Sequence, residues 1–370
     1  MVYVALPVAR CICACARVLL VLALLLCALI GVGPTPAWAE ELFDPPAPSA
    51  MADEILIMST RAVGTVCDGK RLSEKLRCQR YEIGDNGCPH WKCMDWRDAL
   101  QPASQVRKPA SPMRTVVYIH GNRIEPGEDR YRGMLIYRSL VAQGRPSQPI
   151  RFIIWSWPAT TILGPIKDFR LKAARTCPVG WQLAWFLDQL PEETPVSLIG
   201  YSYGARIASG ALHVLGGGRL NGLPLTERLH PQRPPIRVAM IAAAFDADWM
   251  LPGRYHDRAI SQVEELIVVT NHRDLVMRLY HLTVDRGRIH ALGKEGVPHA
   301  RSLGEAARRI KSVDMTHEVG RSHLLVDYLA ATGKMGVVWC RLIPSAKPSA
   351  EPSTDADESS LGGFCSQSQR

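Results

Sequence analysis

A serine flanked by glycines is the pattern in this sequence with the clearest chemical meaning. The motif Gly200-Tyr201-Ser202-Tyr203-Gly204 follows a β-prone run at residues 195–199 and precedes residues 205–217, which are rich in Ala, Ile and Leu at helical spacing. This order predicts a strand, a sharp turn and a helix, with the serine in the turn. Glycines fit two residues to either side because a Cβ there would collide with the neighbouring strand or helix. We therefore predict that Ser202 is a nucleophile; the alternative is a turn whose serine only caps the helix.

A serine hydroxyl is a weak nucleophile until a base accepts its proton and an acid orients that base. The chain order expected for this turn is serine, then Asp or Glu, then His. Asp274 and Asp246 each come soon after a predicted strand, and Asp274 is preferred because the later strand is the usual place for the acid. His323 and His317 both follow the last predicted strand, and His323, at the mouth of a terminal helix, is the preferred base. Asp246 and His317 stay open as alternatives.

The oxyanion that forms during acyl transfer needs preorganised hydrogen-bond donors. The backbone N–H of Tyr203, directly after the nucleophile, is one candidate by position. Gly121 and Asn122, which follow an early predicted strand, supply the other. The glycine allows the backbone to come close, whereas Asn122 could instead be an ordinary turn residue.

The elements that position these residues alternate along the chain. The expected strands are residues 54–60, 115–119, 151–157, 196–199, 236–243, 265–270 and 311–315, and the expected helices are 131–142, 180–190 and 205–215. Such alternation predicts an α/β fold with a mostly parallel sheet covered by helices on both faces, and active residues at the carboxyl ends of the strands. Substrate choice falls to loops at 123–132, 159–178 and 216–235, of which the second has the pattern of an amphipathic helix.

These residues resemble the α/β-hydrolase superfamily in type and order: His120-Gly121-Asn122, the turn at Ser202, Asp274 and His323. Three further stretches are similar to a bacterial esterase-like branch whose members mostly lack known substrates. They are Ile-Trp-Ser-Trp-Pro at 154–158, Ala-Ala-Ala-Phe-Asp at 242–246 and Gly-Arg-Ser-His at 320–323. The match covers about residues 114–332. The resemblance implies the α/β-hydrolase fold and a serine hydrolase with neither a metal nor an organic cofactor.

Residues 1–39 have the pattern of an export signal. Arg10 and Arg17 precede an apolar run at 18–32, and Ala37-Trp38-Ala39 offers a cleavage site before Glu40. A retained N-terminal anchor is the alternative, although the run is shorter than the roughly 20 residues of a spanning helix. We expect a secreted, periplasmic or cell-envelope protein, with contact to a membrane only if this leader is retained.

The remainder divides into three parts. Residues 40–113 are expected to hold a first strand, linkers and a cysteine-rich segment, residues 114–343 the hydrolase domain, and residues 344–370 a disordered tail rich in Pro, Ser, Asp and Glu. In an oxidising compartment the crowded cysteines predict two disulfides in a loop-rich excursion from the sheet, with the pairing open: Cys67, Cys78, Cys88 and Cys93. A zinc site that uses His90 is the alternative interpretation.

The charge pattern excludes one class of partner. The formal net charge is +9, yet no Lys/Arg block or interleaved aromatic pattern occurs, so no nucleic-acid partner is expected. The sequence predicts an exported serine hydrolase that acts on a small-molecule ester, in preference to an amide, through an acyl-enzyme. The alternative is a noncatalytic exported binding or scaffold protein on the same fold. The oligomeric state is not predicted.

Overall fold

The computed structural model describes residues 53–62, 76–84, 87–100, 112–282 and 290–344. The predicted leader, the linker up to residue 52, Cys67 and the predicted tail from residue 345 lie outside the described residues. Their assignments therefore stay predictions.

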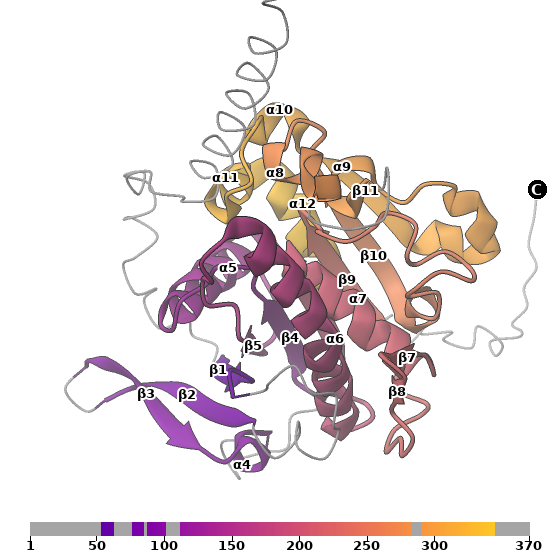
Figure 1. Cartoon of the computed structure of the whole chain (residues 1–370). Helices are drawn as coiled ribbons and strands as arrows, with labels where there is room; N and C mark the ends of the chain where they lie inside the picture. Colours follow the sequence, from indigo (N-terminus) through magenta and orange to yellow (C-terminus); the bar gives the residue numbers. More distant parts are fainter. Residues whose placement is uncertain (1–52, 63–75, 85–86, 101–111, 283–289, 345–370) are drawn as a thin grey trace, which may run out of the picture.

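A nine-stranded sheet forms the centre of the molecule, in the order β11-β10-β9-β6-β4-β5-β1-β2-β3 (Figure 1). The strands are β1 (Glu54–Ser59), β2 (Arg77–Ile83), β3 (Pro89–Met94), β4 (Arg114–Ile119), β5 (Ile150–Ser156), β6 (Val196–Tyr201), β9 (Ile236–Ile241), β10 (Val263–Thr270) and β11 (Ile310–Asp314). All neighbours from β11 to β1 pair in parallel, whereas the pairs β1–β2 and β2–β3 are antiparallel. A separate two-stranded ribbon joins β7 (Arg219–Leu220) and β8 (Leu223–Pro224).

Helices cover both faces of the sheet, as expected for parallel strands (Figure 1). The longer ones are α5 (Glu128–Gly144), α6 (Pro165–Gln189), α7 (Tyr203–Leu215) and α12 (Thr332–Leu342). The shorter ones are α4 (Trp96–Leu100), η1 (Ala259–Gln262), α8 (Leu275–Arg278), η2 (Tyr280–Leu282), α9 (Leu292–Glu295), η3 (Ala300–Arg309), α10 (Thr316–Val319) and α11 (Leu325–Ala330). No helix in the described ranges is both long enough and apolar enough to cross a membrane.

Alternate side chains of each central strand enter two separate cores. In β4, Val117 and Ile119 pack with α6 and α7, whereas Val116 and Tyr118 pack with α5 and α12. This alternation follows from the two-residue period of a strand, because successive side chains point to opposite faces. The strands are therefore apolar on both faces, which is why they appear in the sequence as continuous hydrophobic runs.

The chain changes direction across the sheet at β4. From β4 it passes through α5 to β5 on one side, and then returns through α6 to β6 on the other. Ligands of open α/β sheets bind outside the carboxyl ends of the strands at such a switch point. The strand order, the crossovers and the turn at Ser202 confirm the prediction of an α/β-hydrolase fold.

The structure differs from the sequence prediction in the cysteine-rich segment. Its described part is not an excursion from the sheet, because β2 pairs with β1, and β3 pairs with β2, as an antiparallel extension at one edge. Cys78 lies opposite Met94, and Cys93 lies opposite Gln79, so the two cysteines point to opposite faces of this hairpin. Cys78 is buried and Cys93 exposed, and both are free thiols. Two disulfides would need all four cysteines, so the prediction of two disulfides in this segment is not confirmed.

The expected loop at 159–178 is in large part helical. Residues 165–178 form the first half of α6, and Pro178 lies inside that helix. A proline within a helix costs about 3 kcal/mol because it removes a hydrogen bond and crowds the preceding turn. The long contact of α6 with α7 outweighs this local cost, so an amphipathic helix, and not a lid loop, covers this side of the sheet.

Candidate active site

Ser202 lies in a tight turn between β6 and α7. Its backbone is at φ 53° and ψ −117°, a region that L residues rarely occupy. A Cβ at Gly200 would lie 2.5 Å from the Cα of Ala205, and one at Gly204 would lie 2.0 Å from the carbonyl oxygen of Ile119. Both glycines are therefore required sterically, as the sequence pattern predicts. The turn holds the serine side chain at the carboxyl end of the central strand, where it is 7% exposed.

Two further predicted residues meet the serine there. His323 Nε2 lies 3.1 Å from Ser202 Oγ, and His323 Nδ1 lies 2.7 Å from Asp274 Oδ2. A neutral imidazole that donates from Nδ1 to the carboxylate leaves Nε2 as the acceptor for the serine hydroxyl. Asp274 is completely buried, whereas the His323 side chain is 15% exposed. The three groups thus form one hydrogen-bonded chain whose outer end, at the serine, can be reached from solvent.

The carboxylate is held in place by its own partners. Asp274 caps α8, and its Oδ1 accepts hydrogen bonds from the backbone N–H groups of Val276 (2.9 Å) and Met277 (3.0 Å). Its Oδ2 also accepts from the hydroxyl of Tyr328 at 3.2 Å. Because these donors hold both oxygens, the carboxylate can present one fixed edge to His323.

Tyr201, the residue before the nucleophile, holds the histidine loop. Its hydroxyl donates to the backbone carbonyl of His323, and the two rings stack with centroids 5.5 Å apart. Burial raises the pKa of Tyr201 above its usual range, so the phenol stays a neutral donor. Asn271 adds a bond from its Nδ2 to the carbonyl of Ser322 at 3.3 Å. Sequence reasoning missed both residues, although an aromatic residue inside the glycine motif was a usable signal for Tyr201.

The two alternatives that the sequence left open lie elsewhere. Both oxygens of Asp246 are engaged, by the indole N–H of Trp249 at 2.7 Å and by the hydroxyl of Tyr280 at 2.8 Å. Burial raises the pKa of Asp246. His317 is an exposed residue of α10. The structure thus brings Asp274 and His323 to Ser202. Figure 1 shows α8, α10 and α11, the short helices next to these two residues, gathered at one end of the molecule.

The predicted oxyanion segments flank the serine. Tyr203 is the first residue of α7, where backbone N–H groups point out of the helix start. A Cβ at Gly121 would lie 3.2 Å from the Cβ of Ser202, so the loop after β4 passes directly beside the nucleophile. The side chain of Asn122 is engaged, because its Nδ2 donates to Asp168 Oδ2 at 2.9 Å. Its Oδ1 has no hydrogen-bond partner among the described residues, and the backbone N–H of Asn122 stays the candidate oxyanion donor.

Asp168 of α6 anchors this loop and was not found from the sequence. Besides Asn122, it accepts hydrogen bonds from Arg123 Nε (3.1 Å), Lys172 Nζ (2.8 Å) and the backbone N–H of Ile162 (3.0 Å). The side chains of Asp168 and Lys172 are both completely buried. Burial acts to raise the pKa of Asp168, but the hydrogen bonds from Lys172 and Arg123 outweigh it, so the pKa is lowered. The acid and the lysine four residues later were the only sequence signal.

His120 links the same loop to the one after β5. The ring is buried, its Nδ1–H donates to the carbonyl of Gly121 at 2.8 Å, and its Nε2 accepts from the backbone N–H of Trp157 at 3.2 Å. Burial lowers the pKa of His120 to about 3, so the ring is neutral and both bonds can persist at physiological pH. This histidine therefore supports the loop and does not take part in the chain at Ser202.

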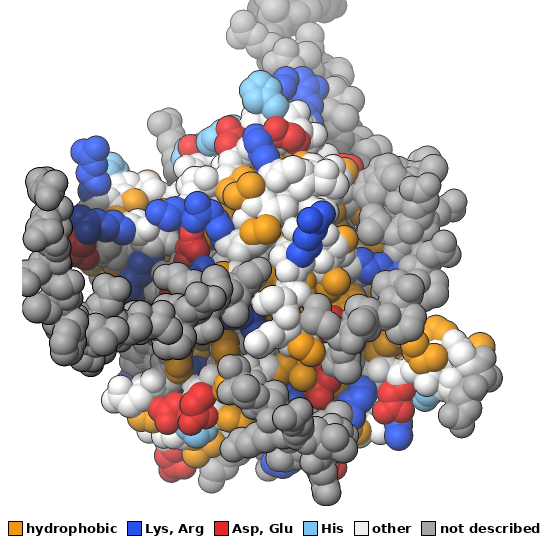
Figure 2. Space-filling model, turned by 180° about the vertical axis from the view of Figure 1, so that it is seen from behind, with side chains coloured by type: hydrophobic (Ala, Val, Ile, Leu, Met, Phe, Trp, Pro, Cys, Tyr) orange, Lys and Arg blue, Asp and Glu red, His pale blue; other side chains and the backbone are white. Residues whose placement is uncertain are grey.

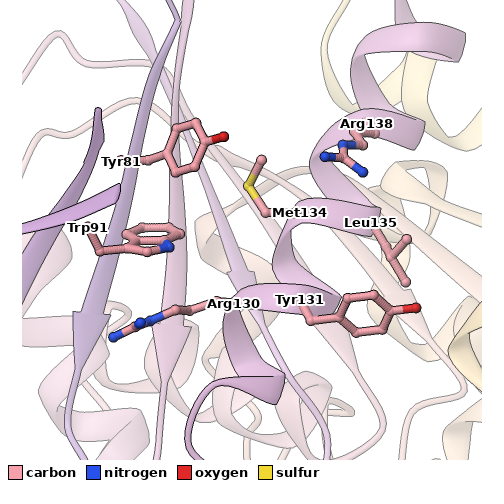
Figure 3. A pocket seen from close by; sticks show the side chains of 7 residues that line it. All are labelled: Tyr81, Trp91, Arg130, Tyr131, Met134, Leu135 and Arg138. Atoms are coloured by element: carbon pink, nitrogen blue, oxygen red, sulfur yellow. The ribbon is translucent and has the colours of Figure 1, made fainter. Parts of the chain in front are cut away.

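A cavity of ≈ 240 Å³, which Ser202 does not line, lies between the β2–β3 hairpin and α5. Figure 3 shows Tyr81 and Trp91 on the hairpin side and Met134 and Leu135 on the helix side. The guanidinium of Arg130 lies over the ring of Trp91, with Cζ 5.5 Å from the ring centroid.

Within the described ranges, no cluster of three or more His, Cys, Asp or Glu side chains could hold a metal ion. On the face drawn in Figure 2, Lys and Arg side chains are interspersed with Asp and Glu.

No protein-family model matches the chain, and no curated protein matches it. Among solved structures, it is similar to acyl-protein thioesterase 2 from Zea mays, at 14% identity and a TM-score of 0.31, over 63% of this chain and 97% of that one. It is also similar to an acetylxylan esterase, at 14% identity and a TM-score of 0.33, over 63% of this chain and 100% of that one. The esterase B of Lactobacillus rhamnosis is 12% identical, with a TM-score of 0.36, over 86% of this chain and 95% of that one.

Proposed function

We propose that this protein is an exported serine hydrolase that cleaves carboxylic esters through an acyl-enzyme. One observation carries the proposal: the hydrogen-bonded chain from Ser202 Oγ through His323 to the buried carboxylate of Asp274, with distances of 3.1 and 2.7 Å. An imidazole held between a hydroxyl and a carboxylate is the arrangement that turns serine into a nucleophile. Export rests on the pattern of residues 1–39.

In this mechanism Ser202 Oγ attacks the ester carbonyl while its proton passes to His323 Nε2. Asp274 stabilises the imidazolium and stays ionised. The tetrahedral intermediate places its negative oxygen near the backbone N–H groups of Tyr203 and Asn122. The His323 proton then moves to the leaving alcohol, the ester C–O bond breaks and an acyl-serine remains. Water attacks this acyl group with His323 again as base, which releases the acid and restores the serine.

A fluorophosphonate probe tests the proposal on the full-length protein. We expect the parent to be labelled and to hydrolyse short-chain nitrophenyl esters, and Ser202→Ala to lose both properties. His323→Ala should lower kcat/KM by roughly 10⁴-fold, because removing one member of such a triad removes most of the rate enhancement. His317→Ala is the matched control and should stay within about twofold, because this histidine is exposed in α10.

Three outcomes separate the alternatives. Loss of labelling in Ser202→Ala and His323→Ala, with His317→Ala unchanged, supports the proposed nucleophile and base. Loss in His317→Ala instead of His323→Ala would overturn the choice of base. A folded parent that neither labels nor hydrolyses any ester would contradict the hydrolase and favour the noncatalytic binding protein.

A further inference from the structure

Arg206 lies one helical turn beyond the nucleophile. It is the fourth residue of α7, and helical side chains lean toward the N-terminus of their helix, which here is the end that carries Ser202. Its Cζ is 4.5 Å from the ring centroid of Trp249 and 6.0 Å from that of Tyr203. The segment that carries Trp249 starts at the carboxyl end of β9, next to β6, and Ala244 of this segment donates its N–H to the carbonyl of Ser202 at 3.2 Å. The guanidinium therefore lies at the same edge of the sheet as the nucleophile.

Two of the three guanidinium nitrogens of Arg206 lack an acceptor among the described residues. Its Nε and Nη1 atoms are buried, and neither has a hydrogen-bond partner among the described residues. The nearby carboxylate of Asp246 is turned to other donors, the indole of Trp249 and the hydroxyl of Tyr280. Within the described ranges no ion pair joins Arg206 to Asp246. Burying charged donors without an acceptor destabilises a protein, so such a group at a reactive centre points to an acceptor on the ligand.

The groups around Arg206 indicate which kind of anion its guanidinium could bind. A guanidinium offers a planar fork of donors that matches a carboxylate with two parallel hydrogen bonds. Trp249 lies under its flat face, so an anion would have to meet the guanidinium in its plane. Burial raises the pKa of the neighbouring Asp246 while Arg206 acts to lower it, so an acidic group already lies near the guanidinium. A monoanion suits this site better than a doubly charged phosphate.

We propose that Arg206 determines substrate specificity by binding a carboxylate, so that the preferred substrates are esters whose acyl or alcohol part carries a second, ionised carboxyl group. The inference rests on the proposed hydrolysis at Ser202 and adds a substrate class to it. Arg206 acts on binding and orientation only, and takes no part in proton transfer.

Two nitrophenyl esters of equal length test the inference. The 4-nitrophenyl monoester of glutaric acid and 4-nitrophenyl pentanoate differ mainly in a terminal carboxylate against a terminal methyl group. After subtraction of uncatalysed hydrolysis, we expect the parent to show a kcat/KM roughly 10- to 100-fold higher for the glutarate ester, the gain from a charge-assisted hydrogen-bonded pair. Arg206→Gln should abolish that preference through KM while the pentanoate ester stays within about twofold, and Arg206→Lys should restore part of it.

The control variant is Arg254→Gln, which removes the same charge from an arginine side chain that is 61% exposed in the same segment after β9. It should keep the preference. Equal rates of the parent on both esters would overturn the inference whether or not Arg206→Gln folds, and so would an equal fall on both esters in a folded Arg206→Gln protein. Failure of the proposed function is distinguishable, because then neither ester turns over and the serine probe does not label the parent.

Discussion

Replacing Asp168 by asparagine should disturb both stability and activity, because this buried acid joins the segment at Ile162 to the loop after β4, which passes beside the nucleophile. Its Oδ1 accepts from Lys172 Nζ and the Ile162 N–H, and its Oδ2 accepts from Asn122 Nδ2 and Arg123 Nε. An asparagine has one acceptor oxygen, so its NH₂ group must face two of these four donors. The substitution also removes the negative charge that neutralises a completely buried ammonium group.

The size of the stability loss follows from the complete burial of the Asp168–Lys172 ion pair. Removing one partner of a buried ion pair costs about 3–5 kcal/mol, because the other charge stays buried without compensation. Replacing both partners by uncharged groups costs much less. We therefore expect Asp168→Asn to lower the free energy of unfolding by about 3–5 kcal/mol, and the double variant with Lys172→Met to recover at least about half of that loss. The loop at Asn122 loses its anchor in both, so kcat should fall about tenfold or more.

Urea unfolding followed by tryptophan fluorescence measures these differences, and pH provides a second check. The pKa of Asp168 is lowered in the folded protein. A carboxyl of this kind contributes stability that is present above its unfolded pKa, about 3.9, and is lost as the pH falls through the folded pKa. The gap between the parent and Asp168→Asn should therefore be full at pH 7 and shrink below about pH 4.

An exposed pair is the control. Glu305 and Arg308 are 2.9 Å apart with side chains 82% and 81% exposed, so Glu305→Gln should change stability by less than about 0.5 kcal/mol. The reasoning is refuted if Asp168→Asn costs less than about 1 kcal/mol, or if Lys172→Met restores none of the loss.

Three further substitutions test the site itself. Gly204→Ala should destabilise the fold by more than about 3 kcal/mol in thermal unfolding, because its Cβ would lie 2.0 Å from the carbonyl oxygen of Ile119; an unchanged Tm would contradict this. Tyr201→Phe removes the hydroxyl that holds the His323 carbonyl, and steady-state kinetics should show kcat lowered about three- to tenfold with KM unchanged. A rise in KM alone would argue against this positioning role. Asp274→Asn should lower kcat by about 10⁴-fold, because an amide facing His323 Nδ1 favours the wrong tautomer; a loss below tenfold would exclude Asp274 as the orienting acid.

The sequence by itself determined the features that depend on local geometry. Short apolar runs predicted the buried strands, and the paired glycines predicted a strained turn at Ser202, because both follow from neighbouring residues along the backbone. The chain order of Ser202, Asp274 and His323 then narrowed the acid and the base to two candidates each. Local pattern also misled: the cysteines suggested an excursion where β2 pairs with β1, and the helix expected at 180–190 is only the second half of α6.

Only the tertiary structure decided which of these groups meet. His323 lies 121 residues from Ser202 and 49 from Asp274, and Asp246 and Asp274 both come soon after a strand. Which carboxylate faces the imidazole therefore depends on strand order, helix caps and the packing of short helices, none of which has a period in the sequence. The same holds for Asp168 and Arg206. In the sequence, a charged helical residue that becomes buried cannot be told from one that stays exposed. The elements that pack against its helix decide whether it is buried and which hydrogen-bond partners it has.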